Sequence, residues 1–394
     1  MSSRPTASIP DIARKSIILF CIVNFFYWMA NYLFQPILSV YTQSIGADLA
    51  MVGTIVAAYG LPQLIVRIPL GIAFDITRKK KLFLMLGIAA TAIGALGLGL
   101  APNFGLLFLA RVITGIGAAY WVVITVYFIA YYPPAGIRKA VSTLNFVQGI
   151  AVVSATLSGG FIAEAYGYKP TFWIAAGLGL VAIIVLFFTR QPVVPRQEGF
   201  SRQAFGIVLR NPLLIGVSVM GLLLQFANWS GLFGFTPVYA AQIGASKAEL
   251  GLITMLATGG SAVVALAVPR LLKGFGASMT LILGALLLTV TIAIVPSINS
   301  VAILEVVMAF NGVARGLLTT TFMMLTVQSA SPGQRATAMG IYQATYALGM
   351  FLGPQVSGFA ASGLGLSAVF YLSAALSLSI GAVSLLPAVR KVKA

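Results

Sequence analysis

Three arginines lie inside long apolar stretches of this sequence, where charged side chains are rare: Arg67, Arg111 and Arg315. An arginine at the centre of a bilayer costs roughly 2.5–3.5 kcal/mol on insertion scales, so each should face the interior of a helix bundle or a wet cavity. A buried guanidinium without a carboxylate beside it can serve as the counter-charge for an anionic ligand. The alternative is a structural role, in which carbonyls or side chains of a neighbouring helix accept its hydrogen bonds.

Arg315 has the residue pattern that best suits ligand binding. Asn311 lies one helical turn before it and Thr319 one turn after it, so the three side chains share a helix face. Glu305 is ten positions away and is directed off that face. We therefore expect Arg315 to bind an anion, and a pair with a group on another helix is the alternative.

Two stripes of amide and indole side chains accompany these cations. Each stripe recurs at helical spacing, so its members fall on one face. An unsatisfied amide in hydrocarbon is costly, so both faces should meet protein or water. The stripes predict a mixed polar and aromatic pocket, or else hydrogen bonds that tie helices together. Their residues are Asn24, Trp28, Asn31 and Gln35 on the first, and Gln225, Asn228, Trp229 and Thr236 on the second. Weaker candidates are Tyr120, Trp121, Asn145, Gln148, Tyr342 and Tyr346.

The elements that position these residues must be membrane helices. Of the 394 residues, 59% are hydrophobic and only 8% are charged, whereas a soluble domain carries about 25% charge. A bilayer core needs about 20 apolar residues per helix, which leaves room for about twelve helices. Unbroken apolar runs such as Leu82–Leu100 exclude a spanning β-barrel, whose strands alternate polar and apolar side chains. We predict an all-α integral membrane protein.

Twelve transmembrane helices follow from the apolar runs, and the distribution of positive charge supports that number. Nineteen of the 24 lysines and arginines fall in the loops on one side, and only Lys169 and Lys247 fall in the loops on the other. By the positive-inside rule, this bias places both termini in the cytoplasm. The predicted spans are 16–41, 50–74, 82–101, 104–131, 140–165, 169–189, 211–240, 248–269, 277–296, 300–327, 336–361 and 366–387.

A long polar stretch divides the spans into two groups of six, and short sequence patterns of the first group recur in the second. The tripeptide Ile-Gly-Ala at 45–47 precedes Gly53, and the same tripeptide at 243–245 precedes Gly251. We therefore predict two pseudo-symmetric halves. Their bounds are 1–189 for the N-terminal half, 190–210 for a cytoplasmic linker and 211–394 for the C-terminal half.

The turn between the second and third spans carries a specific pattern. A glycine and an acid, Gly71 and Asp75, are separated by three residues. Two further residues lead to Arg78, which the cations Lys79 and Lys80 follow. This arrangement resembles Gly-x-x-x-Asp-x-x-Gly-Arg-Arg/Lys, the loop between the second and third helices of the major facilitator superfamily of transporters. Arg78 takes the place of the second glycine.

The fourth span supports the same resemblance. Arg111, Gly115 and Gly117 match the Arg-x-x-x-Gly-x-Gly motif that the superfamily has on its fourth helix. The resemblance covers the whole chain and implies two six-helix halves that rock around a central substrate site near the bilayer midplane. It implies either proton coupling or a buried polar network for Arg111.

The resemblance also implies a latch and a set of gating residues. Asp75 would meet the start of the eleventh helix near residue 336 and favour the outward-open state, since a carboxylate at a helix N-terminus gains about 0.3–1 kcal/mol. Glu164 and Glu305, near the outer ends of their helices, are the acids that could titrate within the membrane. The candidate coupling and gating residues are Arg67, Gly71, Asp75, Arg78, Lys79, Arg111, Glu164 and Glu305.

Two substrate classes fit these residues. The aromatic and amide stripes favour an efflux-type carrier of small amphipathic compounds, whereas the excess of membrane arginines over membrane acids favours an organic-anion uniporter, symporter or exchanger that uses Arg315. A non-transporting membrane receptor is a third possibility, and it would have no need of the polar stripes. We expect no enzymatic activity, no cofactor and no nucleic-acid partner. We expect a monomer in the plasma or inner membrane that transports a small molecule. The sequence leaves open whether protons are transported as well.

Overall fold

The chain is helical throughout the part that the computed structural model describes, namely residues 11–133, 136–192, 206, 210–331, 334–385 and 387. The first half contains α1 (Asp11–Tyr32), α2 (Leu38–Ser44), α3 (Leu49–Ala57), α4 (Gly60–Ile76), α5 (Lys80–Leu100), α6 (Phe104–Ala119), α7 (Trp121–Ile129), α8 (Ile137–Tyr166) and α9 (Tyr168–Phe187). The second half contains α11 (Pro212–Ser230), the π-helix η2 (Gly231–Phe235), α12 (Thr236–Gln242), α13 (Lys247–Ala265), α14 (Val268–Ala293), the short 3₁₀ turn η3 (Val295–Ser297), α15 (Val301–Gln328), α16 (Arg335–Leu364) and α17 (Ser367–Ser384).

These helices combine into twelve membrane-length spans, which confirms the predicted fold class. Ten segments are long and apolar enough to cross a membrane by their own composition, and α1 with α2 and α16 complete the set. Four of the spans are interrupted. One interruption contains Pro36, which has no N–H for the helix ladder, and another is the π-helix η2, a form that is frequent at functional sites. Most of the predicted linker lies outside the described residues, so the predicted domain bounds stay a prediction.

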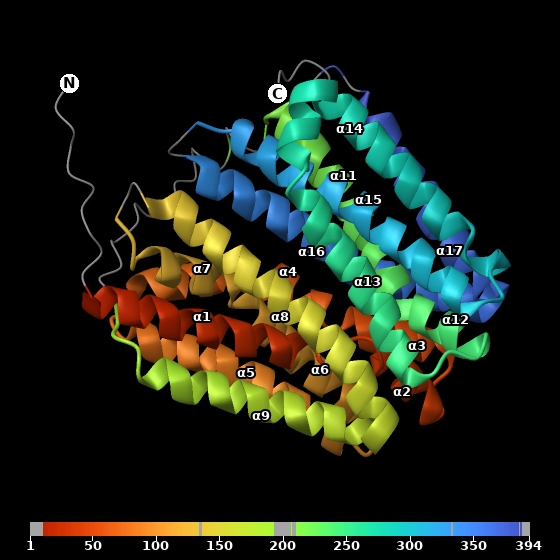
Figure 1. The fold of residues 1–394 in the computed structure, drawn as a ribbon, viewed down its shortest axis with the longest axis horizontal. Coiled ribbons are helices and arrows are strands. Elements are labelled where there is room, and N and C mark those ends of the chain that lie inside the picture. Colours follow the sequence, from red (N-terminus) through yellow and green to blue (C-terminus); the bar gives the residue numbers. More distant parts are fainter. Residues whose placement is uncertain are drawn as a thin grey trace.

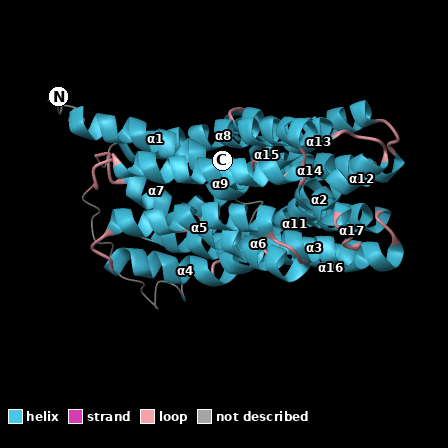
Figure 2. Cartoon of the chain, turned by 90° about the horizontal axis from the view of Figure 1, so that it is seen from below, coloured by secondary structure: helices cyan, strands magenta, loops and turns pink. Residues whose placement is uncertain are grey.

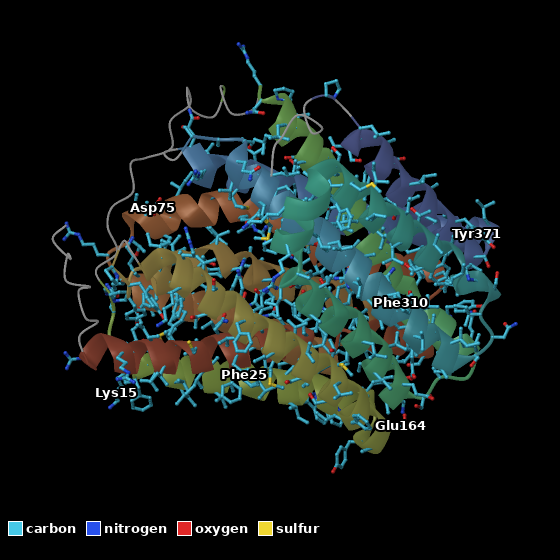
Figure 3. The ribbon with its side chains drawn as sticks, turned by 45° about the horizontal axis from the view of Figure 1, so that its top comes forward. Lys15, Phe25, Asp75, Glu164, Phe310 and Tyr371 are labelled. Atoms are coloured by element: carbon cyan, nitrogen blue, oxygen red, sulfur yellow. The ribbon has the colours of Figure 1, made fainter. Side chains whose placement is uncertain are left out.

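The two halves lie side by side and approach each other more closely at one end than at the other (Figure 1). We call the end with the α4–α5 turn, the start of α1 and the end of α17 the basic end, and the end with the α2–α3 and α12–α13 turns the far end. Lys15 and Asp75 lie at the basic end, and Glu164 lies at the far end (Figure 3). The view from below shows the helices running lengthwise between these ends (Figure 2).

At the far end the halves meet backbone to backbone through glycines. Helix α3 packs on α16, and α8 packs on α13. A Cβ atom added to Gly53 would lie 2.8 Å from the Cα of Gly358, and one added to Gly251 would lie 2.8 Å from the Cα of Gly160. Such distances exclude any larger residue unless the helices move apart, in keeping with the use of small residues where membrane helices cross closely. Nearer the basic end, Gly149 on α8 has nothing within 4 Å of its added Cβ, so the contact there is looser.

We predict that Gly251→Val separates the two halves at the far end, because the new side chain would collide with the backbone of α8. The measurement is the distance between spin labels on cysteines replacing Tyr166 and Gln242, both exposed, in a background where Cys21 is serine. Gly259→Val is the matched control, since its Cβ would meet a Val153 methyl group at 3.8 Å and the Met255 sulfur at 4.0 Å, both at ordinary contact distance. An unchanged distance in the Gly251 variant would show that glycine contact does not set the far-end spacing.

Candidate functional site

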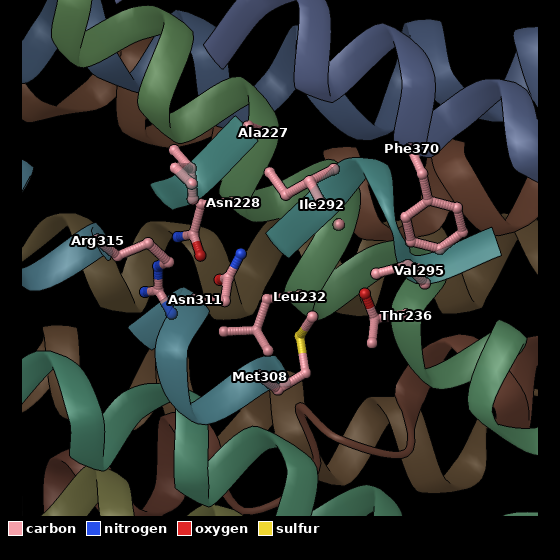
Figure 4. Close-up of a pocket in the computed structure, with 12 residues that line it drawn as sticks. Ala227, Asn228, Leu232, Thr236, Ile292, Val295, Met308, Asn311, Arg315 and Phe370 are labelled. Carbon is pink, nitrogen blue, oxygen red and sulfur yellow. The ribbon is translucent and has the colours of Figure 1, made fainter. Parts of the chain in front are cut away.

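Arg315 lies at the edge of a small cavity inside the second half (Figure 4). Asn228 from α11 and Asn311 from α15 lie on the same side of the cavity as its guanidinium group. The remaining walls are mostly apolar and include Leu232, Ile292, Met308 and Phe370. The cavity leaves about 10 Å³ for the centre of a water-sized sphere, which is room for a single water molecule. A substrate would therefore have to enlarge this cavity in order to bind in it.

Two polar atoms at this cavity are buried without a hydrogen-bond partner among the described residues: Nη1 of Arg315 and Oδ1 of Asn228. Asn228 donates through its Nδ2 to Oε1 of Gln225 at 3.0 Å. Asn311 donates through its Nδ2 to Oγ1 of Thr291 at 3.1 Å. The structure therefore brings Gln225, Asn228, Asn311 and Arg315 together and leaves one donor and one acceptor free for a ligand.

Thr319, the third residue of the predicted Arg315 face, is not part of the lipid-facing side of α15. It is exposed, one turn beyond Arg315 toward the basic end. The lipid-facing side of α15 is marked by Ile303, Val306 and Phe310, each more than half exposed. Thr319 is nine residues after Phe310, which places it on the opposite side of a helix with 100° per residue. Its exposure is therefore directed away from the lipid-facing side of α15.

The stripe that begins on α1 and ends at Gln35 is buried, and its amide nitrogens donate internal hydrogen bonds. Oδ1 of Asn24, Oδ1 of Asn31 and Nε1 of Trp28 have no partner among the described residues. Asn24 donates through its Nδ2 to the carbonyl of Leu144 on α8 at 3.1 Å, and Asn31 donates to the carbonyl of Tyr27 at 2.8 Å. Asn24, Asn31 and Gln35 are at most 1% exposed. Trp28 packs edge-on against Trp121 with ring centres 5.2 Å apart. The Asn24 bond joins α1 to α8, whereas the Asn31 bond lies within α1, so the choice between a pocket and a tie between helices stays a prediction.

Arg111 is fully buried in the first half, and its partners are neutral. Its Nη2 donates to Oε1 of Gln35 at 3.0 Å, and its guanidinium carbon lies 4.4 Å from the ring centre of Tyr59. A cation over an aromatic face gains about 0.5–2 kcal/mol, more when it is desolvated. Arg111 therefore ties α6 to the α1–α2 break and to the break between α3 and α4. Its Nε and Nη1 are buried without a partner among the described residues, so both expected roles, proton coupling and a buried polar network, stay predictions.

An aromatic cluster crosses between the halves beside Arg111. Tyr59 stacks on Trp229 with ring centres 4.7 Å apart, and Trp229 packs against Phe233 at 4.9 Å. Phe233 in turn meets Tyr32 of the first half at 5.9 Å. Tyr59, Trp229 and Phe233 are at most 3% exposed. We call Tyr32, Tyr59, Trp229 and Phe233 the aromatic seam; it occupies the space between the halves on the far-end side of the predicted site.

Arg67 bridges the halves through side chains rather than backbone carbonyls. Its Nη1 donates to the Tyr346 hydroxyl at 3.1 Å and to Oε1 of Gln343 at 3.4 Å, both on α16. Its Nη2 donates to Oε1 of Gln63 at 2.6 Å within α4. It is 6% exposed. Arg67 thus joins α4 to α16 at a position nearer the basic end than the glycine contacts between the halves.

The predicted latch stays a prediction, because part of its partner, residues 332–333 and the side chain at 336, lies outside the described residues. Asp75 is half-buried at the end of α4, and its carboxylate has no hydrogen-bond partner among the described residues. Lys80 caps the same helix end by donating through Nζ to the carbonyls of Phe74 at 2.6 Å and Asp75 at 3.4 Å. Gly71 has nothing within 4 Å of an added Cβ, so no close approach requires glycine there. Arg78 and Lys79 are exposed.

The two acids proposed to titrate are at the far end. Glu164 accepts a hydrogen bond through Oε2 from the backbone N–H of Lys247 at 2.8 Å, so a carboxylate of the first half meets the first residue of α13 in the second. The Lys247 ammonium lies 4.8 Å from the ring centre of Tyr168. Glu305 is half-exposed in the second turn of α15. Among the described residues, no three histidine, cysteine, aspartate or glutamate side chains cluster as metal ligands would.

Several contacting residues were missed or underrated by the sequence analysis. Gln343 was not considered, and Tyr346 was a weaker candidate, although both bind Arg67. Tyr59 gave no signal because it lies in an apolar run with no amide at helical spacing. Gly358 could have been found as the counterpart of Gly160, once Gly53 and Gly251 were recognised as equivalent by the repeat.

Comparison with known proteins gives one consistent family. The sequence profile of the Major Facilitator Superfamily matches residues 20–243 and again 220–394. An uncharacterized MFS-type transporter of Methanocaldococcus jannaschii is 22% identical over 387 residues, which cover 95% of this chain and 98% of the relative.

Solved structures of transporters share the fold. The nucleoside transporter NupG superposes with a TM-score of 0.76 at 17% identity, covering 97% of this chain and 100% of NupG. A bacterial homologue of the human lysosomal transporter Spinster, in an inward-facing and occupied conformation, gives a TM-score of 0.76 at 17% identity over 99% of this chain and 98% of its own. With its twelve spans in two halves and a family profile that matches nearly the whole length, this chain belongs to the Major Facilitator Superfamily of membrane transporters.

Proposed function

We propose that this transporter is a secondary carrier of small organic anions and that Arg315 supplies the counter-charge. The observation that supports this proposal is the buried Nη1 of Arg315, which has no partner among the described residues. A cation left unpaired in a membrane interior is costly, and such residues mark substrate or ion pathways. Oδ1 of Asn228, also unpaired and on the same cavity, would accept a hydrogen bond from a hydroxyl or amino group of the same substrate.

The positions of the acidic residues favour an anion over a cation. Asp48 caps the N-terminus of α3, and Glu249 takes part in the N-terminal capping box of α13. Asp75 and Glu164 lie at opposite ends of the bundle. Glu305 lies near the start of α15. The membrane interior of the described residues therefore holds three arginines and no central carboxylate, and its net positive potential would attract an anion and repel a cation.

The alternative, an efflux-type carrier of amphipathic compounds, has weaker support. It rests on aromatic side chains that line the site, but Trp28 is 6% and Trp229 is 2% exposed. Both indoles pack against other aromatic rings. These indole rings are therefore covered by other side chains and are not available to a ligand in this structure. The receptor alternative is set aside by the family match.

We further propose that the structure is one state of an alternating-access cycle, closed at the far end and open at the basic end. The glycine contacts, the aromatic seam and the Glu164 bond hold the far end. At the basic end the Asp75 carboxylate has no hydrogen-bond partner among the described residues, and Thr319 is exposed. The excess of positive charge supports a cytoplasmic basic end with both termini inside. Residues 190–210 would then be the cytoplasmic linker between the halves.

We predict that Arg315→Ala abolishes anion transport while leaving the protein folded. The loss should be at least about 30-fold, since removing one member of a buried charge pair costs about 2 kcal/mol or more. The measurement is counterflow of radiolabelled pyruvate, succinate and benzoate in proteoliposomes, with monodispersity as the test of folding. Arg315→Lys should retain part of the activity, because it keeps the charge but loses the planar fork.

Arg270→Ala is the matched control for Arg315→Ala, because it removes the same charge from an exposed position on α14. It should transport normally. Undiminished anion counterflow by a folded Arg315→Ala protein would exclude Arg315 as the substrate's counter-charge.

We predict opposite conformational effects for two acid-to-amide changes. Glu164→Gln weakens the far-end hydrogen bond, because a charged group at a helix N-terminus contributes about 0.3–1 kcal/mol. It should therefore lower the ratio of the state open at the basic end to the state closed there by about two- to fivefold. Asp75→Asn removes a latch made only in the other state, so it should raise that ratio. The measurement is maleimide labelling of Thr319→Cys in a Cys21→Ser background.

Glu305→Gln is the control for the two changes, because it removes a far-end charge that makes no hydrogen bond among the described residues. It should leave the labelling rate unchanged. Shifts of the same sign for Glu164→Gln and Asp75→Asn would contradict the assignment of one latch to each end.

A further inference from the structure

The basic end carries a second hollow, separate from the central site. It has a volume of about 320 Å³ and lies where the α4–α5 turn meets the end of α9. Its lining contains three cations and no acid. The lining residues are Arg78, Lys79, Lys81, Leu82, Met85, Phe187 and Gln191.

The shape of this hollow is fixed by hydrogen bonds between the turn and α9. The backbone N–H of Lys81 donates to Oε1 of Gln191 at 3.1 Å, and Nε2 of Gln191 donates to the carbonyl of Arg78 at 3.3 Å. Nζ of Lys81 donates to the carbonyl of Thr189 at 2.7 Å and to that of Phe187. Lys81 is thus engaged with the protein, whereas the charged groups of Arg78 and Lys79 are exposed and have no partner among the described residues.

The hollow has one charged side and one apolar side that continues onto the membrane surface. Leu82 is 50% exposed and Phe187 is 66% exposed. Leu86, one turn after Leu82 on α5, is also exposed, and α5 and α9 pack against each other along this surface. Positive charge in membrane-side loops is expected from topology alone. Topology does not account for a hydrogen-bonded hollow that places two free cations directly beside exposed apolar side chains.

We infer that this hollow binds an anionic phospholipid from the leaflet at the basic end. The phosphodiester would lie against Arg78 and Lys79, and an acyl chain would follow Leu82, Leu86 and Phe187 along α5 and α9. Basic pockets between membrane helices recognise lipid headgroups in this way, and clustered cations strengthen binding to anionic lipid. A free phosphate ester would share the charged contacts but would leave the apolar side empty.

The test is native mass spectrometry of the full-length protein with phosphatidylglycerol and phosphatidylcholine of identical acyl chains. Phosphatidylglycerol should bind preferentially, with one tightly held molecule. Arg78→Gln with Lys79→Gln should weaken that binding by about 25-fold, since each cation near an anionic lipid surface contributes a factor of about five. Arg138→Gln with Lys139→Gln is the matched control, because it removes two exposed charges from the basic end of α8, outside the hollow. It should change binding by less than about twofold.

Two further arms separate the sources of the phosphate group and guard against misfolding. Glycerol 1-phosphate in a hundredfold excess should leave the lipid bound, and displacement of the lipid would show a site for free phosphate esters instead. Phe187→Ser keeps every charge and should weaken phosphatidylglycerol several-fold by removing the apolar wall. Equal binding of the two lipids, or equal losses in the two double variants, would overturn the proposal. The test is independent of Arg315 and of the transported substrate.

Discussion

The structure depends on how a membrane interior accommodates three arginines without a central acid. Arg111 is held by an amide and an aromatic face in the first half. Arg67 is held by two amides and a tyrosine hydroxyl across the interface. Arg315 keeps a buried donor without a partner. Nε and Nη1 of Arg111 and Nε of Arg67 are also buried without a partner, but each of these two arginines makes at least one hydrogen bond, whereas Arg315 makes none among the described residues. In the proposed function, this difference separates two structural arginines from one that would bind the substrate.

The second constraint is that the halves must separate and rejoin without leaving buried polar groups exposed to lipid. At the far end the contact is made by glycine backbone and aromatic rings, together with one hydrogen bond from Nε2 of Gln355 to Oγ1 of Thr54 at 3.1 Å, which water could replace when the halves part. One carboxylate, Glu164, crosses the interface there, and it meets a helix N-terminus that water can also satisfy. In the proposed cycle, Asp75 would make the corresponding interaction at the basic end when that end is closed. Weak contacts at one end would therefore break as weak contacts at the other end form, as an equilibrium between two states of similar free energy requires.

The sequence predicted the fold class, the twelve spans and the equivalence of Gly53 and Gly251, because apolar length, charge asymmetry and internal repetition are local signals. It also brought Asn311 and Arg315 together, since one helix turn separates them. It could not decide between ligand binding and internal hydrogen bonding for Asn24, Asn31 and Gln35, because that depends on which helix packs against them. Arg67's partners on α16 are more than 270 positions away, and nothing in the local pattern of either helix indicates such a pairing.

The account's central claim, an interior built to attract an anion, is tested most directly by uptake into proteoliposomes made with the unaltered protein. Pyruvate, succinate and benzoate would be compared with the lipophilic cation tetraphenylphosphonium, each with and without an imposed pH gradient and against protein-free liposomes. We expect protein-dependent exchange of at least one anion without a pH gradient and no movement of the cation. Gradient-driven movement of tetraphenylphosphonium, with no anion taken up, would contradict the account and return Glu164, Glu305 and Arg111 to the centre of the mechanism.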